Sequence, residues 1–338
     1  MPSLEHPRQE REISRSALLG GLFYYRVRMN GNHQNKRVFA VVVSWNLKER
    51  TEQCLKALSE EKDLSGIILV DNGSKDGTVS SVREKFPTVE IICNDENLGY
   101  AVGNNIGIRK AMEKGAEYVL LINSDAAPGE GAVHALIKAA EEENAGAVGG
   151  KPVKMDSPDI LDGGWGVINW RNMASRLEGE NKKDGAKFSM RREVDYPLGM
   201  ALLLRTQALR EVGLFDESYF AYHEEMELCY RLNLGGWKVI FEPAKFLHGG
   251  SESIKRAGAC LGREYLLARN SVRFVMKYGN TFQKTKFWLF VAGASLLKLF
   301  PELLRGRIKE HLARIHGWWD GLQGKGLSRS TMQKYKLL

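Results

Sequence analysis

The sequence predicts an α/β domain with a mostly parallel, Rossmann-like sheet and helices on both faces, followed by a helical extension. Between residues 38 and 148, apolar runs of strand length alternate with helical patterns of about 10–15 residues, which is typical of a parallel sheet with crossover helices. From about residue 258 onward the pattern is helical and basic. The chain has 338 residues, of which 43% are hydrophobic and 27% charged, so it can bury a sizeable core.

The alternation begins at Val38–Val43, a continuous apolar run of the kind found in strands buried on both faces. The elements predicted after it are, in order, a helix over Leu47–Leu58, a strand over Ile67–Val70, a helix ending near Phe86, a strand over Val89–Ile92, a helix over Tyr100–Lys114, a strand over Tyr118–Ile122, a helix over Gly131–Glu143 and a strand at Ala147–Val148. Residues 151–200 are rich in Gly, Asp, Asn and Trp, which predicts loops and short antiparallel strands. The last predicted elements are a strand over Met200–Leu204, helices over Thr206–Val212 and His223–Leu234, and a strand over Lys238–Phe241.

The N-terminal part of the chain differs from this region. Residues 1–36 are polar and charged apart from a short apolar run, 17–25, which lacks a signal-peptide cleavage pattern. We interpret residues 1–36 as a disordered or flexible lead, with a short amphipathic anchor as the alternative. The α/β domain is then expected at residues 37–255 and a basic amphipathic helical extension at residues 256–338.

Net charge and cysteine spacing narrow the class of protein. Of the formal net charge of +8, residues 255–338 contribute +13, from 17 Lys or Arg and 4 Asp or Glu, so residues 1–254 carry −5. Such asymmetry indicates that the basic end meets a polyanion or an anionic membrane. The four cysteines are widely spaced without a Cys-x-x-Cys pair, which disfavours a zinc site or redox motif and fits a reducing cytoplasm.

The basic end contains an apolar stretch at residues 287–297. At eleven residues it is shorter than the ~20 that span a bilayer. The next helix mixes leucines and isoleucines with arginines and lysines and ends near Trp318-Trp319, which predicts a helix pair lying on an anionic membrane. A helical cap on the α/β domain or an interface between two copies of the chain is the alternative. Nucleic-acid binding is disfavoured, because aliphatic stripes suit lipid better than phosphate.

Four polar motifs are expected at one edge of the sheet. Ligands of open parallel sheets bind at the carboxyl ends of the strands. Each motif alone has an ordinary explanation, because Asp-Asn-Gly-Ser forms turns in any protein and an Asp after a strand often caps a helix. Four together indicate a ligand site, and the lack of Gly-x-Gly-x-x-Gly in the first turn disfavours a dehydrogenase-type dinucleotide site. The motifs are Ser44-Trp45-Asn46, Asp71-Asn72-Gly73-Ser74-Lys75-Asp76-Gly77, Asn97-Leu98-Gly99-Tyr100 with Gly103-Asn104-Asn105, and Asn123-Ser124-Asp125.

These motifs resemble those of the family 2 glycosyltransferases with the GT-A fold, and more closely the branch that contains bacterial rhamnosyltransferases. Further matching stretches are Gly199-Met200-Ala201, Gly213-Leu214-Phe215-Asp216-Glu217, Tyr222-His223-Glu224-Glu225-Met226-Glu227-Leu228-Cys229, Leu247-His248-Gly249-Gly250 and Arg269-Asn270. The resemblance covers about residues 38–275, in order. It implies an inverting, metal-dependent transferase that takes a sugar from a nucleotide-diphosphate donor. The expected donor is dTDP-rhamnose, with a UDP-hexose as the next choice.

The resemblance assigns the nucleotide-sugar site to the first four motifs. Asp71 would hydrogen-bond the base of the donor, and Ser44 with Asn97 would line the nucleotide pocket. Gly99 and Gly103 have no Cβ atom and would let the backbone approach the nucleotide closely. The other residues expected in this site are Trp45, Asn46, Asn72, Ser74, Asn104 and Asn123.

The resemblance also implies Mg²⁺ or Mn²⁺. Asp125 stands at the last position of the family's Asp-x-Asp-like motif, with Asn123 at the first. These cations prefer oxygen ligands and bind diphosphates with few carboxylates, where they act as Lewis acids on the leaving group. His248 would complete the metal shell, although a lone His is otherwise more often a structural residue.

An acidic cluster is expected to face the acceptor. Glu224, Glu225 and Glu227 match a family cluster usually written Glu-Asp-x-Asp, although acids in a first helical turn also complement the helix dipole without any catalytic role. Glu225 aligns with the general base that takes the proton of the acceptor hydroxyl. Because Glu replaces the usual Asp there, Glu224 is the alternative base. Glu227 and Gly199 are expected to contact the acceptor.

The expected acceptor is a lipid-linked saccharide or a polysaccharide of the cell envelope, reached from the cytoplasmic face of the inner membrane. Residues 151–198, where the family pattern is weakest, are expected to set selectivity. Nucleotidyltransferases share the sheet type but carry a Gly-rich loop with Lys or Arg after the first strand, which Ser44-Trp45-Asn46 does not offer. A catalytically inactive, membrane-associated scaffold is the non-enzymatic alternative, because Asn123 and Glu225 depart from the family pattern.

Overall fold

The computed structural model describes residues 36–170, 174–250 and 260–337. The lead predicted at residues 1–36 lies outside the described residues except for Lys36, and so does the boundary predicted at residues 255 and 256.

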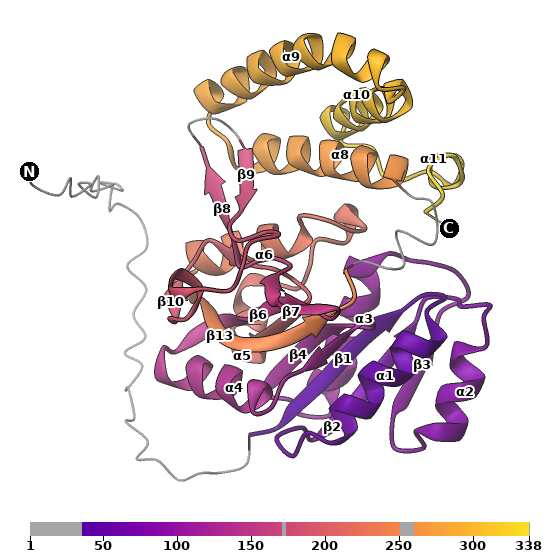
Figure 1. Cartoon of the computed structure of the whole chain (residues 1–338), viewed down its shortest axis with the longest axis vertical. Coiled ribbons are helices and arrows are strands. Elements are labelled where there is room, and N and C mark those ends of the chain that lie inside the picture. The colour runs from indigo at the N-terminus through magenta and orange to yellow at the C-terminus, as the bar shows by residue number, and fades with distance from the viewer. Residues whose placement is uncertain (1–35, 171–173, 251–259, 338) are drawn as a thin grey trace, which may run out of the picture. The chain divides into compact units, whose positions relative to one another are not determined.

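A ten-stranded mixed sheet forms the centre of the α/β region (Figure 1). The strand order is β10-β13-β6-β12-β4-β1-β2-β3, with β5 paired to β13 and β7 paired to β6. β12 runs antiparallel to both β4 and β6, whereas β3, β2, β1 and β4 are parallel. The strands are β1 (Val38–Ser44), β2 (Gly66–Asp71), β3 (Glu90–Cys93), β4 (Tyr118–Asn123), β5 (Ala126–Pro128), β6 (Ala145–Lys154), β7 (Ser157–Leu161), β10 (Arg192–Glu193), β12 (Ala201–Arg205) and β13 (Lys238–His248). A second sheet joins β11 (Tyr196–Pro197), β8 (Trp165–Asn169) and β9 (Ala174–Leu177).

Helices cover both faces of the large sheet, as predicted (Figure 1). Successive residues of β1 point to opposite faces, so Ala40 and Val42 pack with one hydrophobic cluster and Val41 with the other. The first cluster includes side chains of α1 (Lys48–Ser59), α2 (Thr78–Lys85) and α4 (Ala132–Glu142), and the second includes side chains of α3 (Tyr100–Glu113), α5 (Thr206–Val212) and α6 (Glu224–Leu234). Two short 3-10 helices, η1 (Ala186–Phe188) and η2 (Glu217–Tyr219), lie between these elements in the sequence.

The register of the parallel strands brings three of the polar motifs to one level. Ser44 at the end of β1 pairs with Asp71 at the end of β2, and Val43 pairs with Asn123 at the end of β4. The loops after these strands therefore open on the same edge of the sheet, where parallel sheets bind their ligands.

Two strands are longer than the sequence pattern predicts. β6 extends to Lys154 and β13 to His248, beyond the apolar runs that mark their starts. The two strands run parallel, and the far end of β13 also pairs antiparallel with β5, so that His248 lies opposite Ala126. Pairing between distant segments satisfies the backbone here despite the weak local pattern, and it carries His248 to the loop that holds Asp125.

Among residues 260–337, the structure has four helices after β13, which lie together at one end of the picture in Figure 1. They are α8 (Cys260–Tyr278), α9 (Thr281–Leu304), α10 (Ile308–Leu322) and α11 (Arg329–Lys334). Two glycines bring α10 close to α8: a Cβ atom on Gly317 would lie 2.3 Å from the Tyr265 carbonyl oxygen, and one on Gly321 would lie 2.5 Å from that of Arg269. Side chains at these positions would force the helices apart, so this contact depends on small residues.

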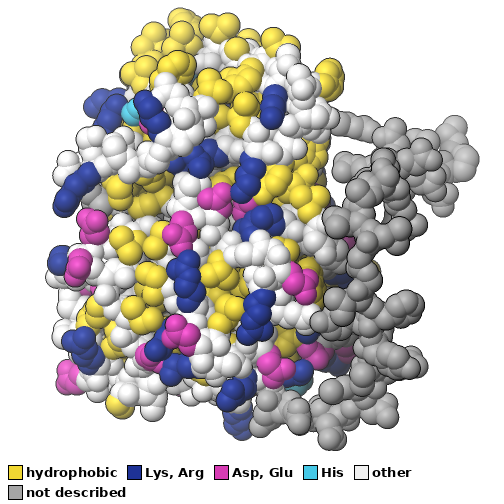
Figure 2. Space-filling view, turned by 180° about the vertical axis from the view of Figure 1, so that it is seen from behind, with side chains coloured by type: hydrophobic (Ala, Val, Ile, Leu, Met, Phe, Trp, Pro, Cys, Tyr) yellow, Lys and Arg dark blue, Asp and Glu magenta, His cyan; other side chains and the backbone are white. Residues whose placement is uncertain are grey.

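Helix α9 is longer than the apolar stretch that the sequence marks. It has 24 residues and is capped by Asn280 and Gln283, each side chain bonded to the other's backbone N–H. Within the described residues, α9 is the one helix long and apolar enough to cross a membrane, with a mean hydropathy of 1.5 over its best window. Little of that window is buried, and Figure 2 shows hydrophobic side chains gathered over the end of the molecule where α9 lies.

Candidate active site

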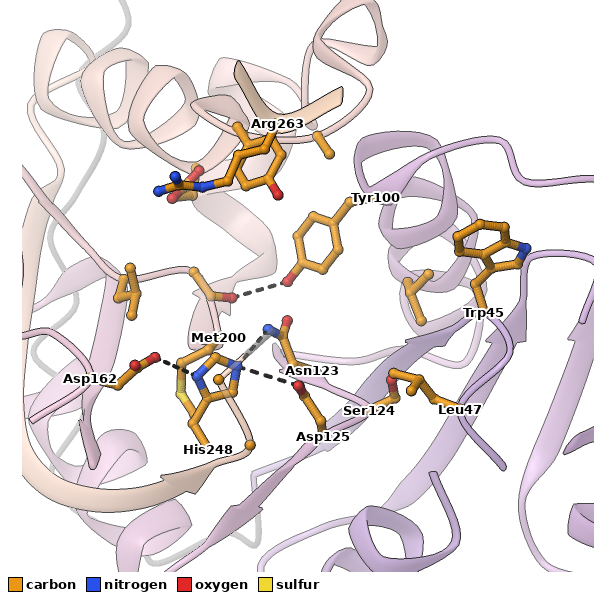
Figure 3. A pocket seen from close by; sticks show the side chains of 18 of the residues that line it. Trp45, Leu47, Tyr100, Asn123, Ser124, Asp125, Asp162, Met200, His248 and Arg263 are labelled. Carbon is orange, nitrogen blue, oxygen red and sulfur yellow. Dashed lines mark hydrogen bonds and ion pairs between the residues drawn. The ribbon is translucent and has the colours of Figure 1, made fainter. Parts of the chain in front are cut away.

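A cavity of about 790 Å³ opens at the carboxyl edge of the sheet, and residues from the strand ends, the loop before α6, the end of β13, α8 and the segment after α11 line it (Figure 3). Such a volume is within the range of small-molecule sites. The predicted site residues that line it are Ser44, Trp45, Asn72, Asn97, Gly99, Asn123, Asp125, Gly199, Glu224, Glu225 and His248. The predicted residues outside the lining are Asn46, Asp71, Ser74, Gly103, Asn104 and Glu227.

Three of the residues outside the lining fasten the first two loops to each other. The Asn46 backbone N–H donates to Ser74 Oγ at 2.9 Å, and Asn46 Oδ1 accepts the Lys75 backbone N–H at 2.7 Å. Asp71 Oδ2 accepts the Ser74 backbone N–H at 2.9 Å. These bonds hold the two loops in one arrangement beside the cavity.

Asp71 also keeps one polar atom without a partner. The side chain is buried, and its Oδ1 atom receives no hydrogen bond from any described residue. A buried acceptor without a donor costs free energy, so such atoms in native proteins call for an explanation. A ligand N–H, such as that of a nucleobase, would satisfy this oxygen.

A chain of amides continues from this point. Asn72 Nδ2 donates to the Gly99 carbonyl oxygen at 3.1 Å and to Asn97 Oδ1 at 3.3 Å. The Gly99 backbone N–H donates back to Asn97 Oδ1 at 3.0 Å, and Asn94 Nδ2 donates to Asn72 Oδ1 at 2.8 Å. The loop before α3 is therefore fixed by side chains that also face the cavity.

The two glycines expected to admit the nucleotide instead make room for other parts of the chain. A Cβ atom on Gly99, which has a φ of +88°, would lie 2.5 Å from the Phe220 ring. One on Gly103 would lie 2.9 Å from a methyl group of Val43, at the contact of α3 with β1. Asn104 is buried and bonds the Tyr100 carbonyl oxygen of its own helix at 2.9 Å. Gly103 and Asn104 thus have packing roles in the structure and lie outside the cavity lining, so their predicted contact with the nucleotide stays a prediction.

Asp125 and His248 come together on one wall of the cavity (Figure 3). His248 Nε2 lies 3.4 Å from Asp125 Oδ1 and 3.4 Å from Asn123 Nδ2. On its other side, His248 Nδ1 lies 2.6 Å from Asp162 Oδ2. A carboxylate behind the second nitrogen of an imidazole is the arrangement that orients histidine ligands of metals.

The electrostatics of this wall favour a cation. Burial alone would lower the pKa of His248, but hydrogen bonds and charge from Asp125 and Asp162 outweigh burial and raise the pKa to about 9. The hydrogen bond with His248 likewise lowers the pKa of Asp162. Asn123 Oδ1 is buried and accepts no hydrogen bond from any described residue.

These residues fit a divalent cation that also binds a diphosphate. Within residues 36–170, 174–250 and 260–337, no group of three or more His, Cys, Asp or Glu has the arrangement of a complete metal site. Mg²⁺ and Mn²⁺ need no complete protein cage, because one or two protein ligands suffice when phosphate oxygens supply the rest. Asp125, His248 and the unpartnered oxygen of Asn123 form a donor set of that kind.

Another part of the lining contains two glutamates at the start of α6, of which Glu224 is buried and Glu225 half-buried. Glu224 and Glu225 each have one carboxylate oxygen, Oε2, without a hydrogen-bond partner among the described residues. Burial and the charge of Glu225 raise the pKa of Glu224 well above its usual range, and burial raises the pKa of Glu225. Both carboxyls are thus stronger bases than exposed glutamates.

The loop before these glutamates has an uncommon backbone. Phe220, Tyr222 and His223 have φ values of +64°, +69° and +66°. Residues other than glycine rarely adopt this left-handed region. Such conformations persist where the surrounding structure imposes them, and they gather at functional sites.

Helix α8 imposes this conformation. Asn270 Nδ2 lies within 3.0 Å of the carbonyl oxygens of Tyr219, Ala221 and Tyr222, and Arg269 donates to that of Ser218 at 2.8 Å. Asn270 and Arg269 are fully buried. The sequence noted this pair as a motif without a role, and the contacts show that it shapes the loop that precedes Glu224.

Glu227 does not face the cavity. It is fully buried, and its carboxylate bonds Arg231 and Lys277, at 2.8 Å and 2.9 Å, and the Tyr278 hydroxyl. These bonds join α6 to α8 and leave Glu227 outside the cavity lining, so contact of Glu227 with the acceptor stays a prediction without a supporting contact here. Gly199, by contrast, lies beside Glu225: a Cβ atom there would be 3.3 Å from Glu225 Cβ.

Sequence reasoning missed several residues of the cavity. Asp162 lies in the stretch where the family pattern is weakest, and Arg263 and Lys336 lie in what the sequence presented as a membrane-binding extension. Tyr100 was part of a motif but had no assigned role; its hydroxyl donates to the Gly199 carbonyl oxygen at 3.0 Å, next to Glu225. The polar Leu161-Asp162-Gly163-Gly164 turn is the one local signal that could have indicated Asp162.

Comparison with known proteins gives this geometry a family. The family model described as "Glycosyl transferase family 2" matches residues 39–199. The chain is 30% identical over 241 residues to the N-acetylglucosaminyl-diphospho-decaprenol L-rhamnosyltransferase of Mycobacterium tuberculosis (strain CDC 1551 / Oshkosh), which covers 64% of this chain and 77% of that protein. It is 24% identical over 250 residues to a dTDP-rhamnosyl transferase of Shigella flexneri, with 72% and 81% covered.

Solved structures agree on the fold. A mannosyltransferase from Pyrobaculum calidifontis, in complex with GDP-Man and Mn²⁺, superposes with a TM-score of 0.53 at 17% identity and covers 86% of this chain and 88% of its own. The structure of GalNAc-T7 with UDP, GalNAc and Mn²⁺ superposes with a TM-score of 0.55 at 15% identity, covering 77% and 57%. The predicted GT-A fold with C-terminal helices is confirmed. With its sheet-edge cavity, its matching family model and these relatives, the chain belongs to the family 2 glycosyltransferases and is a glycosyltransferase.

Proposed function

We propose that this enzyme is an inverting, metal-dependent transferase that moves a sugar from a nucleotide-diphosphate donor to a lipid-linked saccharide or a polysaccharide of the cell envelope. One observation carries the proposal. The pair Asp125 and His248, which suits a cation bound to diphosphate, lines the same cavity as the unpartnered glutamates Glu224 and Glu225. A leaving-group site and a base in one cavity are what a single displacement at a sugar carbon requires.

In this proposal the donor lies along the carboxyl ends of β1, β2 and β4. The unpartnered Oδ1 atom of Asp71 accepts a nucleobase N–H, and Ser44, Trp45 and Asn97 line the nucleoside side of the cavity. An acceptor oxygen at this point fits the imide N–H of thymine or uracil, which agrees with dTDP-rhamnose as the first candidate and a UDP-hexose as the second. The names of the rhamnosyltransferases in the comparison support the same order.

The diphosphate would be held at Asp125, His248 and Asn123 together with Mg²⁺ or Mn²⁺. When bound, such a cation neutralises the charge that develops on the leaving diphosphate. Asp162 fixes the orientation of the His248 ring through the 2.6 Å contact at Nδ1. The Mn²⁺ in the two solved structures supports the choice of a divalent ion.

The acceptor hydroxyl would be activated by Glu225. Its carboxylate accepts the hydroxyl proton while the acceptor oxygen forms a bond to the anomeric carbon and the bond from that carbon to the diphosphate oxygen breaks. The electron pair of the broken bond leaves with the diphosphate. One displacement inverts the configuration at the anomeric carbon. Glu224, whose pKa is raised by burial and by the charge of Glu225, is the alternative base.

We further propose that the enzyme works at the cytoplasmic surface of the cell membrane, where a lipid-linked acceptor is available. Support comes from α9, whose exposed side chains form an apolar face and which lies in a region with a net charge of +13. The exposed large apolar residues of α9 are Phe282, Leu289, Phe290, Leu296, Leu297, Leu299, Phe300, Leu303 and Leu304. Because α8 and the segment after α11 contact the α/β region and α10 packs on α8, the membrane role is assigned to α9 and not to the whole extension.

A thermal-shift panel of nucleoside diphosphates and nucleotide sugars, with and without Mn²⁺, tests the proposal. Free ligand at 100 times its Kd stabilises the fold by about 2.7 kcal/mol, which is readily measured. We expect a Mn²⁺-dependent rise in Tm with dTDP or UDP compounds, followed by donor turnover once an acceptor is supplied. No shift with any donor, in folded protein, would contradict the proposal and favour an inactive scaffold.

A further inference from the structure

We propose that Lys336 binds the diphosphate of the nucleotide donor, so that the segment 335–337 completes the donor site. The inference rests on the proposed function, because it assumes a nucleotide-diphosphate ligand. It concerns a part of the chain beyond the stretch that resembles the family and beyond the residues that the family model matches.

The segment reaches the donor side of the cavity. Lys336 and Leu337 line the same cavity as Ser44 and Asn97. The Leu337 carbonyl oxygen accepts a hydrogen bond from Asn97 Nδ2 at 3.0 Å, and Asn97 is in turn tied to Asn72 and Gly99. The segment is therefore bonded to the loop that shapes the nucleoside side of the site.

Neighbouring residues hold the segment firmly in this place. The Tyr335 ring is buried and stacks on that of Tyr265, with 4.4 Å between the ring centres and 15° between the planes, and its hydroxyl lies 2.7 Å from His316 Nδ1. Leu337 is buried among Phe220 and other apolar residues. At Gly262 of α8 a Cβ atom would lie 2.7 Å from the Tyr335 carbonyl oxygen. Because both neighbours of Lys336 are packed, its backbone position is fixed.

The backbone of Lys336 takes a conformation that favours glycine. Leu337 N–H donates to the Met332 carbonyl oxygen at 2.9 Å, and Lys336 N–H donates to that of Gln333 at 3.1 Å, which is the Schellman pattern at the end of a helix. Lys336, with a φ of +52°, stands where this pattern usually has glycine. A lysine in a position that disfavours it indicates that its side chain contributes something that glycine would not.

The ammonium group of Lys336 is uncommitted. The side chain is exposed, and it forms no hydrogen bond or ion pair with any residue that the structure describes. The two other Lys or Arg side chains in the lining have neighbours: Lys154 donates to Asn181, and an Arg263 nitrogen lies 3.8 Å from the Glu264 carboxylate. Lys336 can therefore turn its charge to a ligand in the cavity without breaking an existing contact.

The charge of the cavity identifies the ligand class. Asp125, Asp162, Glu224 and Glu225 make the lining acidic around the sites proposed for the cation and the base. A free ammonium on the donor side can pair with a diphosphate, which carries negative charge at neutral pH and is commonly bound by lysine. The hydrogen bond that Asn97 donates to the Leu337 carbonyl oxygen places the neighbouring Lys336 on the donor side.

Affinity measurements on the full chain test the inference. In the presence of Mn²⁺, the Kd values of UDP, dTDP, uridine and thymidine are measured for the wild type, Lys336→Gly, Lys336→Arg and Lys334→Ala. Gly suits the left-handed position, so Lys336→Gly should keep or raise the Tm while it removes the ammonium. Lys334, exposed on α11 and outside the cavity lining, controls for the loss of one positive charge.

We expect Lys336→Gly to weaken UDP or dTDP binding at least about tenfold, the effect of losing one charge-assisted hydrogen bond, with the nucleosides unaffected. Lys336→Arg should retain most of the affinity, and Lys334→Ala should match the wild type. Equal affinity of Lys336→Gly and wild type for the diphosphates would overturn the inference and leave the proposed function standing. Equal weakening of nucleosides and diphosphates would overturn it as well, because the segment would then only shape the pocket. A wild type that binds no nucleotide would overturn the proposed function itself.

Discussion

The sides of the cavity proposed for the donor and for the acceptor differ in how far their polar groups are satisfied by hydrogen bonds. On the donor side, Asn46, Asn72 and Asn97 link three loops through hydrogen bonds of ordinary length, so the site is arranged before a ligand enters. On the side proposed for the acceptor, Glu224 is buried and Glu225 half-buried. Each has an Oε2 atom without a hydrogen-bond partner among the described residues, and both follow a loop with residues in the left-handed region. The first side has the properties of a binding site. On the second side, the left-handed backbone and the unpartnered carboxylate oxygens cost folding stability, as is common at functional sites.

The two sides also differ in which part of the chain holds their loops in place. The donor loops are held by their own side chains, whereas the loop before Glu224 is held by Asn270 and Arg269 of α8. Helix α8 therefore supports the loop that precedes the proposed base. A truncation before α8 would remove this support together with α9, the proposed membrane contact, so single substitutions are the better experiments.

The largest expected effect is at the metal wall. We expect Asp125→Ala to abolish the Mn²⁺-dependent rise in Tm with nucleoside diphosphates and to lower turnover by at least about 10²-fold, because charge on the leaving group is no longer stabilised. Asp156→Ala, which removes an exposed carboxylate of the same cavity, is the control and should retain both properties. If Asp125→Ala still shows the full Mn²⁺ effect, the cation site is elsewhere.

The next largest effect is on the restrained loop. Asn270→Ala leaves buried carbonyl oxygens without a donor, which should cost roughly 1–3 kcal/mol of stability and release the loop that positions Glu224. We expect kcat to fall while the affinity for nucleoside diphosphate stays near that of the wild type, because Asn270 itself bonds only the loop before Glu224 and none of the loops on the donor side.

The matched control is Asn233→Ala, which loses a single 3.3 Å bond to the Asp195 carbonyl oxygen at the surface. Its kcat and stability should stay close to those of the wild type. A loss of nucleotide affinity in Asn270→Ala equal to its loss of kcat would show that the two sides are not held independently.

A smaller effect concerns the pH dependence of stability. Burial and the charge of Glu225 raise the pKa of Glu224, and a carboxyl whose pKa is raised on folding contributes stability below its unfolded pKa and loses it as the pH rises through the folded value. Gln at this position cannot ionise. The free energy of unfolding of Glu224→Gln should therefore exceed that of the wild type by an amount that grows from about pH 4.5 to pH 8 and reaches roughly 0.5–2 kcal/mol. The difference in Tm between the two proteins, followed over this pH range, measures it.

Glu227→Gln provides a control of opposite sign. Its carboxylate is paired with Arg231 and Lys277 in the interior, so removing the charge should destabilise the fold at neutral pH. A Tm for Glu224→Gln that is below that of the wild type at pH 8 would show that the Glu224 charge is stabilised by contacts and not held at a cost.

The smallest effect on turnover is expected at α9. Leu296 and Leu297 are 75% and 80% exposed, and changing both to Ser should weaken the partitioning onto anionic vesicles at least about 100-fold, because each leucine loses about 1.5 kcal/mol or more of lipid burial. Activity on a water-soluble acceptor should be unchanged. Leu234→Ser removes an apolar side chain that is 62% exposed at the end of α6 and should have no effect on sedimentation. Equal sedimentation of all three proteins would exclude α9 as the membrane contact.

The sequence pattern was sufficient for features that depend on local periodicity and insufficient for those made by distant pairing. The alternation from β1 to β6 follows from apolar runs that are buried on both faces. The extension of β13 to His248 and the contact of His248 with Asp162 join residues 86 apart in the chain, and no local pattern encodes such a pairing.

The same reason explains the outcome at the candidate site. Asp125 and His248 were placed by family resemblance, and the structure brings their side chains together. Glu227 was expected at the acceptor because it shares a motif with Glu225, yet a helical step of two residues points the side chains in different directions, and Glu227 faces Arg231 and Lys277. Lys336 lies 239 residues beyond Asn97 and reaches the cavity only through the packing of α8, α10 and α11.

The central claim is that Glu225 performs the chemistry of a donor site that is complete without it. The most direct test compares Glu225→Gln with the wild type for two quantities: the Kd of the nucleotide-sugar donor with Mn²⁺, and the rate of donor turnover with acceptor. We expect Glu225→Gln to bind the donor with an unchanged Kd and to turn it over about 10²–10⁴-fold more slowly, the usual contribution of a general base. Turnover within a few fold of the wild type, at the same Kd, would contradict it.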